Sequence, residues 1–90
     1  MNDSHIDAVL RDLEARDLLT LVRDVCLRRG VLPHELCGRS HRRSIARARH
    51  EVWAMLRADP QRFFSLPDIA RLFRRDPSTV LAGVRAHARR

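Results

Sequence analysis

The chain has 90 residues, of which 25 are Leu, Ile, Val or Phe, so it is long enough for one folded domain and too short for a multidomain enzyme. Its 18 basic residues are all arginines and outnumber 11 acidic ones, a formal charge of +7 that indicates a polyanionic partner. No apolar run approaches the roughly 20 residues that span a bilayer, and Met1-Asn2-Asp3-Ser4 lacks the segments of a signal peptide, which excludes a transmembrane or secreted protein. We expect a complete small cytoplasmic protein with two reduced cysteines.

The first third of the chain has helical periodicity. Ser4-His5-Ile6-Asp7 is a capping-box pattern, and an apolar stripe follows it at Ile6, Val9, Leu10 and Leu13. The phase of the stripe slips near Arg16 and Asp17, so either the helix bends there or a second helix begins with Asp17 as its cap. The next apolar stripe ends at Arg28-Arg29-Gly30, a pattern that favours helix termination. We expect an N-terminal helix over residues 1–16 and another up to residue 29.

The middle third predicts a short helix, a basic loop and a long helix. Pro33 suits the first turn of a helix over 33–37, which Gly38 ends. Residues 38–44 contain arginines and no carboxylate, and they form the predicted loop. A helix over 45–58 then buries Ile45, Val52, Trp53 and Leu56 until Asp59-Pro60 stops it. Phe63 and Phe64 are expected to pack beneath the connection that follows.

The last third predicts two helices joined by a tight turn. Ser65-Leu66-Pro67-Asp68 is a helix start with the serine as cap and the proline in the first turn. Arg74-Arg75 make the turn, and Asp76-Pro77 open the final helix with the carboxylate as cap. The apolar anchors of the two helices have the separation of a helix-turn-helix, which we place at residues 65–87. The whole chain therefore predicts one domain, a compact all-α bundle of five or six helices.

The second helix of such a motif presents its first residues to base edges in the major groove. Asp76 can accept a hydrogen bond from a cytosine amino group, and the hydroxyl groups of Ser78 and Thr79 can serve bases or phosphate. Backbone N–H groups at the two helix starts, near Leu66 and Ser78, can hold phosphates. The alternative is that Asp76, Ser65 and Ser78 act only as helix caps.

Charge is unevenly distributed along the chain. Residues 1–27 hold three arginines against six acidic residues, a charge of −3, whereas residues 28–90 hold fifteen against five, a charge of +10. Five arginines fall within eleven residues at and after the predicted loop, namely Arg39, Arg42, Arg43, Arg47 and Arg49. Because such arginines can follow phosphates or enter a narrow minor groove, we expect a DNA face here, with the acidic N-terminal helix packed away from it. The alternative is a solvated charged surface.

Four segments follow one another in the order of a known family: 31–38 (VLPHELCG), 39–49 (RSHRRSIARAR), 65–73 (SLPDIARLF) and 75–81 (RDPSTVL). On these segments, residues 17–88 resemble the C-terminal DNA-binding domain of the bacterial replication initiator DnaA. The resemblance implies a Trp-repressor-like helix-turn-helix that reads a short DNA box in the major groove, and a basic loop that reaches the adjacent minor groove. The implied partner is double-stranded DNA.

Contact residues follow from the same resemblance. It implies base contacts from Asp76, Pro77, Ser78, Thr79, Arg42 and His41. It implies DNA-backbone contacts from Arg39, Arg43, Arg47, Arg49, Leu66, Pro67, Arg74, Arg75 and Arg85. Four features depart from the family pattern: Pro77 replaces a histidine, Arg74-Arg75 make a turn one residue shorter than the usual one with two glycines, His41 stands where the minor-groove arginine is expected, and Ala48 replaces a proline. The preferred DNA sequence is therefore expected to differ from that of the initiator.

The family's ATPase module is not found in these residues. They contain no glycine-rich phosphate loop and no lysine, so we expect no nucleotide cofactor. A role in replication would then be that of a competitor, accessory factor or regulator at initiator-type sites, and transcription regulation is the other role considered. Either role places the protein at the nucleoid.

Other functions fit the residues less well. Cys26, His34, Cys37 and His41 lack the closely spaced cysteine pair of a zinc site, and no nucleophile, base and orienting group are combined, so we expect no metal, no cofactor and no enzymatic activity. His50 and His87 are expected at the surface, and Trp53 in the core. Two alternatives stay open, a structured-RNA binder and a helical protein-interaction module. The module would use Ile6, Val9, Leu10 and Leu13 as a stripe for a partner or dimer.

Overall fold

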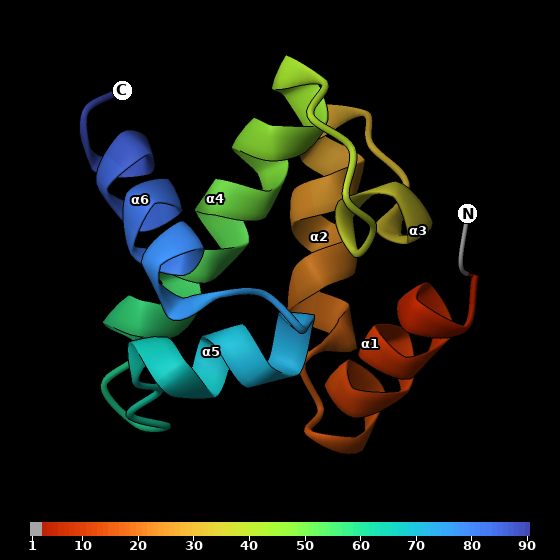
Figure 1. The fold of residues 1–90 in the computed structure, drawn as a ribbon, viewed down its shortest axis with the longest axis horizontal. Coiled ribbons are helices and arrows are strands. Elements are labelled where there is room, and N and C mark those ends of the chain that lie inside the picture. Colours follow the sequence, from red (N-terminus) through yellow and green to blue (C-terminus); the bar gives the residue numbers. More distant parts are fainter. Residues whose placement is uncertain (1–2) are drawn as a thin grey trace.

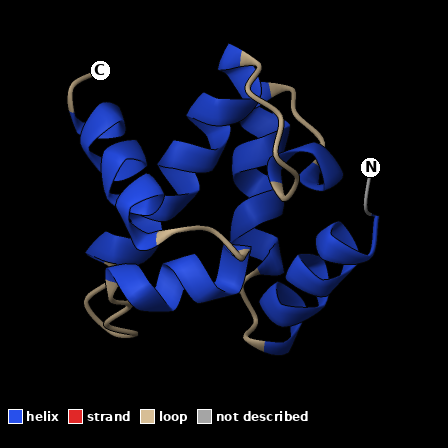
Figure 2. Cartoon of the chain, viewed as in Figure 1, coloured by secondary structure: helices blue, strands red, loops and turns tan. Residues whose placement is uncertain are grey.

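Six helices surround a core whose largest member is Trp53, which is 1% exposed. The computed structural model describes residues 3–90, with the side chain of Asp3 left out, and within that part of the chain it holds helices and loops but no strand (Figure 1, Figure 2). The helices are α1 (Asp3–Ala15), α2 (Leu19–Arg29), α3 (Pro33–Leu36), α4 (Arg43–Ala58), α5 (Leu66–Phe73) and α6 (Pro77–Ala88). The all-α prediction is confirmed. Residues 1–2, on which part of the expected start falls, lie outside the described residues.

The break between α1 and α2 settles the alternative that the sequence left open. A second helix does begin after residue 16, but Asp17 is not its cap. Asp17 instead adopts the left-handed conformation (φ 59°) that ends α1, and the Leu18 N–H donates to the Leu13 carbonyl over 2.8 Å. Leu18 is the N-cap of α2, without a side-chain hydrogen bond. The first helix begins at Asp3, so Ser4 lies inside it.

The long helix α4 runs through the middle of the fold and begins two residues earlier than predicted, at Arg43. Helix α6 packs along it (Figure 1). The two helices approach closely at Gly83, where a Cβ atom would lie 2.6 Å from the Trp53 ring and 2.7 Å from the His50 ring. The Trp53 ring also meets Phe73 of α5 edge-on, with the ring centroids 6.0 Å apart. Trp53 therefore fixes α5 and α6 against α4.

The connection between α4 and α5 corrects one prediction. Phe64 is buried as expected, whereas Phe63 is 79% exposed and has a positive φ of 54°. Asp59 organises this connection because its Oδ1 accepts hydrogen bonds from the N–H groups of Gln61 and Arg62, at 2.9 and 3.3 Å. The turn thus directs only one of the two neighbouring aromatic rings inward.

A buried carboxylate joins α2 to α4. Glu51 binds Arg28 at 2.6 Å and Arg29 at 2.5 Å. Burial opposes ionisation of Glu51, but the hydrogen bonds from the two guanidinium groups outweigh it and lower the pKa of this carboxyl. The two arginines that the sequence predicts at the end of a helix therefore also join that helix to α4.

Candidate nucleic-acid interface

Helices α5 and α6 are joined by a turn that Arg74 closes. Arg74 has a positive φ of 54°, and the N–H of Arg75 donates to the Ala70 carbonyl over 2.9 Å. This is the left-handed helix ending that glycine usually provides. The turn between the two helices is confirmed at Arg74-Arg75, with an arginine in the strained position.

The start of α5 is fixed by a reciprocal pair of hydrogen bonds. The N–H of Asp68 donates to Ser65 Oγ over 3.1 Å, and the N–H of Ser65 donates to Asp68 Oδ2 over 3.0 Å. These hydrogen bonds and the nearby Arg71 lower the pKa of Asp68. Pro67 is exposed and Leu66 is half-buried against the core. The first turn of α5 thus leaves Pro67 accessible at the surface.

The first residues of α6 are exposed, and two of them are hydrogen-bonded to each other. Asp76 Oδ1 accepts from the backbone N–H of Ser78 over 2.8 Å and from its hydroxyl group over 2.7 Å. Both hydrogen bonds lower the pKa of Asp76. The N–H of Ser78 is therefore used internally, which corrects the expectation that it holds a phosphate. Asp76, Pro77 and Ser78 are exposed and Thr79 is half-buried, so their side chains line the outer surface of this helix end.

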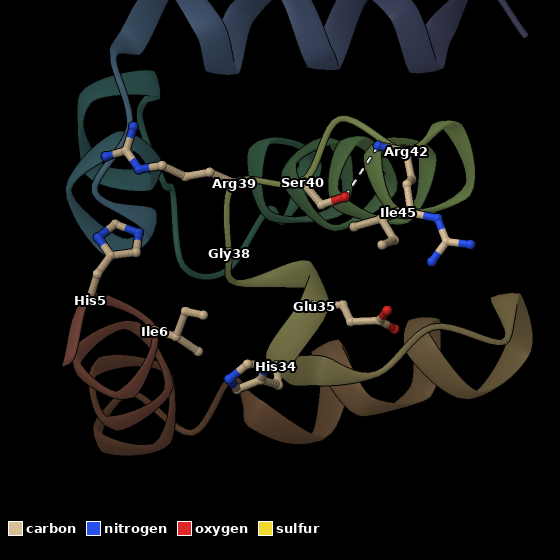
Figure 3. Close-up of a pocket in the computed structure, with 9 residues that line it drawn as sticks. All are labelled: His5, Ile6, His34, Glu35, Gly38, Arg39, Ser40, Arg42 and Ile45. Atoms are coloured by element: carbon tan, nitrogen blue, oxygen red, sulfur yellow. Dashed lines mark hydrogen bonds between the residues drawn. The ribbon is translucent and has the colours of Figure 1, made fainter. Parts of the chain in front are cut away.

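The basic loop lies beside the helix-turn-helix. An Arg39 guanidinium nitrogen donates to the backbone carbonyl of Arg74 over 3.4 Å, which ties the loop to the turn between α5 and α6. His41, Arg42, Arg43 and Arg47 are exposed. The N–H of Arg42 donates to Ser40 Oγ over 3.2 Å, which shapes the end of the loop before α4 begins (Figure 3). The arginine-rich segment and the turn between α5 and α6 are therefore neighbours, although 35 residues separate Arg39 from Arg74.

Arg49 corrects the predicted set of phosphate contacts. It is 3% exposed, and its guanidinium group donates to the carbonyls of Leu36, Gly38 and Ser40 at 2.9, 3.1 and 3.2 Å. Burial, with a smaller repulsion from Arg75, lowers the pKa of Arg49 to about 10, so it is still charged at neutral pH. Arg49 does not reach the surface. It holds the backbone of α3 and the basic loop in one shape.

Two other predicted phosphate contacts are partly engaged within the protein. The guanidinium carbon of Arg75 lies 5.7 Å from the centroid of the Trp53 ring, and burial followed by repulsion from Arg39 lowers the pKa of Arg75. Arg74 lies 3.5 Å from Asp12 of α1. Arg85 is exposed on α6.

The first turn of α1 lies beside the basic loop, on the side where the DNA face is expected, and so does not pack away from it as predicted. His5 and Ile6 line a surface pocket of about 590 Å³ together with residues of α3, the basic loop and α4, namely His34, Glu35, Gly38, Arg39, Ser40, Arg42 and Ile45 (Figure 3). Partial burial, and then the positive charges of Arg39, Arg74 and Arg75, lower the pKa of His5. The start of this acidic helix therefore lies in the positive field of the loop and the turn.

The apolar stripe of α1 is part of the protein's own core. Ile6, Val9 and Leu13 are buried and Leu10 is partly buried against the same core. A partner or a second copy could not use this stripe without opening the fold. The structure therefore contradicts the interaction module that the stripe suggested.

The sequence analysis did not single out two residues that pack the helices of this site together, Gly83 and Glu51. Gly83 permits the close packing of α6 on α4, and a glycine inside a helix is itself a signal because it costs about 1 kcal/mol relative to alanine. Glu51 was the second, and its partners Arg28 and Arg29 are distant in sequence. Trp53 is buried as predicted, and Cys26 and Cys37 are buried as well. Burial raises the pKa of the Cys37 thiol to about 12.

His50 and His87 differ from the surface positions expected for them because both are only partly exposed. Burial, followed by repulsion from Arg90 and other cations, lowers the pKa of His50 to about 4, so it is neutral at physiological pH. In the described residues, no group of three or more His, Cys, Asp or Glu side chains is placed to hold a metal ion. Every helix of residues 3–90 is too short or too polar to cross a bilayer.

A family model described as the bacterial DnaA protein helix-turn-helix matches residues 20–86. The match covers α2 to α6 almost completely and leaves α1 outside it. Comparisons with curated proteins and with solved structures gave no match.

Proposed function

Because the chain belongs to the family of bacterial DnaA helix-turn-helix domains, whose members bind DNA, we propose that it selects DnaA-box-like sites in double-stranded DNA. We propose further that it acts at the nucleoid as a small regulator of replication initiation or transcription. The observation that carries the proposal is the hydrogen bond between Arg39 and the Arg74 carbonyl. It brings an arginine loop and the exposed start of α6 together, as needed to enter adjacent grooves of one duplex.

The start of α6 supplies the groups for base reading. In the major groove, the free oxygen of Asp76 can accept from a cytosine amino group, while Oδ1 keeps Ser78 in place. The methyl group of Thr79 can lie against a thymine methyl. Pro77 offers only apolar contact, because it has no N–H. His41 and Arg42 are exposed, and in this proposal they enter the neighbouring minor groove, where negative potential favours cations.

Phosphate binding falls to the exposed arginines. Arg43 and Arg47 lie one turn apart at the start of α4, which has no acidic residue in its first turn and no side-chain cap. Cations at a helix N-terminus are unfavourable, so an anion bound there relieves repulsion and meets the positive end of the helix dipole. Arg39 of the basic loop and Arg85 of α6 are also exposed and are the further phosphate contacts of this proposal.

The direct test is a competition gel-shift with duplex DNA, single-stranded DNA and structured RNA as competitors, after selection of a preferred duplex from a random pool. We expect the selected duplex to compete best and a random duplex to compete more weakly. If RNA or single-stranded DNA competes as well as the selected duplex, the proposed function is wrong.

Substitution of Thr79 and Arg43 separates base reading from phosphate binding. Thr79→Ala is expected to weaken binding to the preferred box by roughly 1–3 kcal/mol and to leave random duplex nearly unchanged. Arg43→Ala is expected to weaken both equally and to reduce the slope of log K against log salt by about 0.9. Fluorescence anisotropy titrations across a salt series measure both. Identical effects of the two substitutions would contradict the assigned roles.

The ion pair between Asp12 and Arg74 is expected to restrain DNA binding. Both side chains are about half exposed, at 46% and 50%, so the pair is weak, but it neutralises a cation beside the reading helix. Asp12→Asn is expected to tighten duplex binding by roughly two- to fivefold at low salt. Asp7→Asn is the matched control, since it removes one exposed carboxylate of the same helix. Equal gains from the two variants would show that only net charge matters.

A further inference from the structure

The chain segment after α6 returns to the face of α4. An Arg90 guanidinium nitrogen lies 3.4 Å from Nδ1 of His50, which is in the middle of α4. The C-terminal end is drawn at the far end of α6, away from the turn that joins α5 to α6 (Figure 1). Arg89 and Arg90 are therefore remote from the residues assigned to base reading and close to α4.

The helical repeat connects this end of the chain to the start of α4. Arg43, Arg47 and His50 are spaced four and three residues apart, so they share one face of α4. Arg90 contacts the last of the three. We call the group formed by Arg43, Arg47, Arg89 and Arg90 the tail patch. All four of its arginines are exposed.

The tail patch has little neutralising charge. Among the ion pairs of residues 3–90, none involves its four arginines. The carboxylate of Glu51 on the same helix is already bound to Arg28 and Arg29. Partial desolvation, followed by repulsion from Arg47, Arg29, Arg89 and Arg43, lowers the pKa of Arg90. Like charges are thus crowded in a way that a bound polyanion would relieve.

We propose that the tail patch binds the DNA backbone, as a second phosphate-binding surface that continues from the basic loop and is separate from the helix-turn-helix. This inference rests on the proposed function. The seven residue steps from Arg43 to His50 advance about 10 Å along α4, at 1.5 Å per residue. That length corresponds to about three base pairs of B-form DNA, at 3.4 Å per step. The patch therefore extends the bound site by about this length on the side of the basic loop.

The test is the double substitution Arg89→Ala with Arg90→Ala, in the full chain. Two lost phosphate contacts reduce the slope of log K against log salt by about 1.8, and weaken binding at 0.1 M salt by about tenfold or more. The control is Arg11→Ala with Arg23→Ala, which removes two exposed arginines from α1 and α2. It is expected to leave the slope nearly unchanged. Circular dichroism melting shows that both double variants stay folded.

Shortening the DNA supplies a second measurement. Removing about three base pairs from one end of the selected duplex is expected to weaken wild-type binding more than binding by the Arg89→Ala, Arg90→Ala variant, which keeps only Arg43 and Arg47 of the tail patch, whereas trimming the other end affects both proteins equally. If the double variant keeps the wild-type slope of log K against log salt and the wild-type response to trimming, the tail patch does not bind DNA, and the proposed function is unaffected. A wild-type chain that shows no preference for duplex DNA overturns the proposed function as well.

Discussion

Gly83→Ala is expected to lower the free energy of unfolding by about 2 kcal/mol, although alanine is the better helix former by about 1 kcal/mol. The added Cβ would lie 2.6 Å from the Trp53 ring, which is fully enclosed and held edge-on against Phe73. His50 can rotate away because it is at the edge of the core, but Trp53 cannot, so α6 must move outward. In a domain of this size the loss corresponds to a fall in Tm of roughly 10 °C.

Ala82→Gly is the matched control for this substitution, because Ala82 precedes Gly83 on the same helix and is exposed. It is expected to cost about 1 kcal/mol from helix propensity alone. Helix propensity alone therefore predicts that alanine is the more stable residue at both positions. Close packing predicts that alanine is more stable at position 82 and glycine at position 83. A Gly83→Ala protein that is more stable than wild type in urea unfolding would contradict the close packing of α4 and α6.

Arg49→Met is expected to destabilise the DNA-free protein by about 3 kcal/mol, because three carbonyls lose a charged donor in a buried site. It is also expected to reduce DNA affinity at least tenfold, since the basic loop loses the group that fixes its backbone. Arg49→Lys keeps the charge but cannot bond three carbonyls with one planar group, so an intermediate loss of stability is expected.

Arg43→Ala is the comparison variant that distinguishes the positioning role of Arg49 from a phosphate contact. Arg43 is exposed, and its removal is expected to change stability by less than about 0.5 kcal/mol while weakening DNA binding. Urea unfolding without DNA and anisotropy titration with DNA give the two readings. If Arg49→Met leaves stability unchanged and affects only DNA binding, Arg49 acts at the DNA surface and not within the protein.

The sequence predicts the helices well because their limits are marked by local chemistry. Ser65 and Asp68 cap α5, Asp76 caps α6, and Gly30 ends α2, as expected. Helix starts without such a residue are less predictable. α4 begins at Arg43 without a side-chain cap, and α2 begins after Leu18, so nothing local to those positions marks them.

The errors in the site arise from contacts between distant segments. Arg49 follows Ile45 by four residues and precedes Trp53 by four, so it lies on the buried stripe of α4, a signal that outweighs its charge. Its carbonyl partners belong to a different segment, which periodicity cannot show. Phe63 and Phe64 occupy an irregular connection, where no repeat indicates which ring points inward. The contact between Arg39 and Arg74 likewise depends on the assembled fold.

The left-handed Arg74 has a consequence for how this turn can vary among related chains. A side chain in that backbone conformation costs about 1 kcal/mol relative to glycine. Higher stability therefore favours glycine at position 74, whereas positive charge beside α6 favours arginine. At this position of the three-residue turn, backbone strain and positive charge next to α6 thus favour different residues.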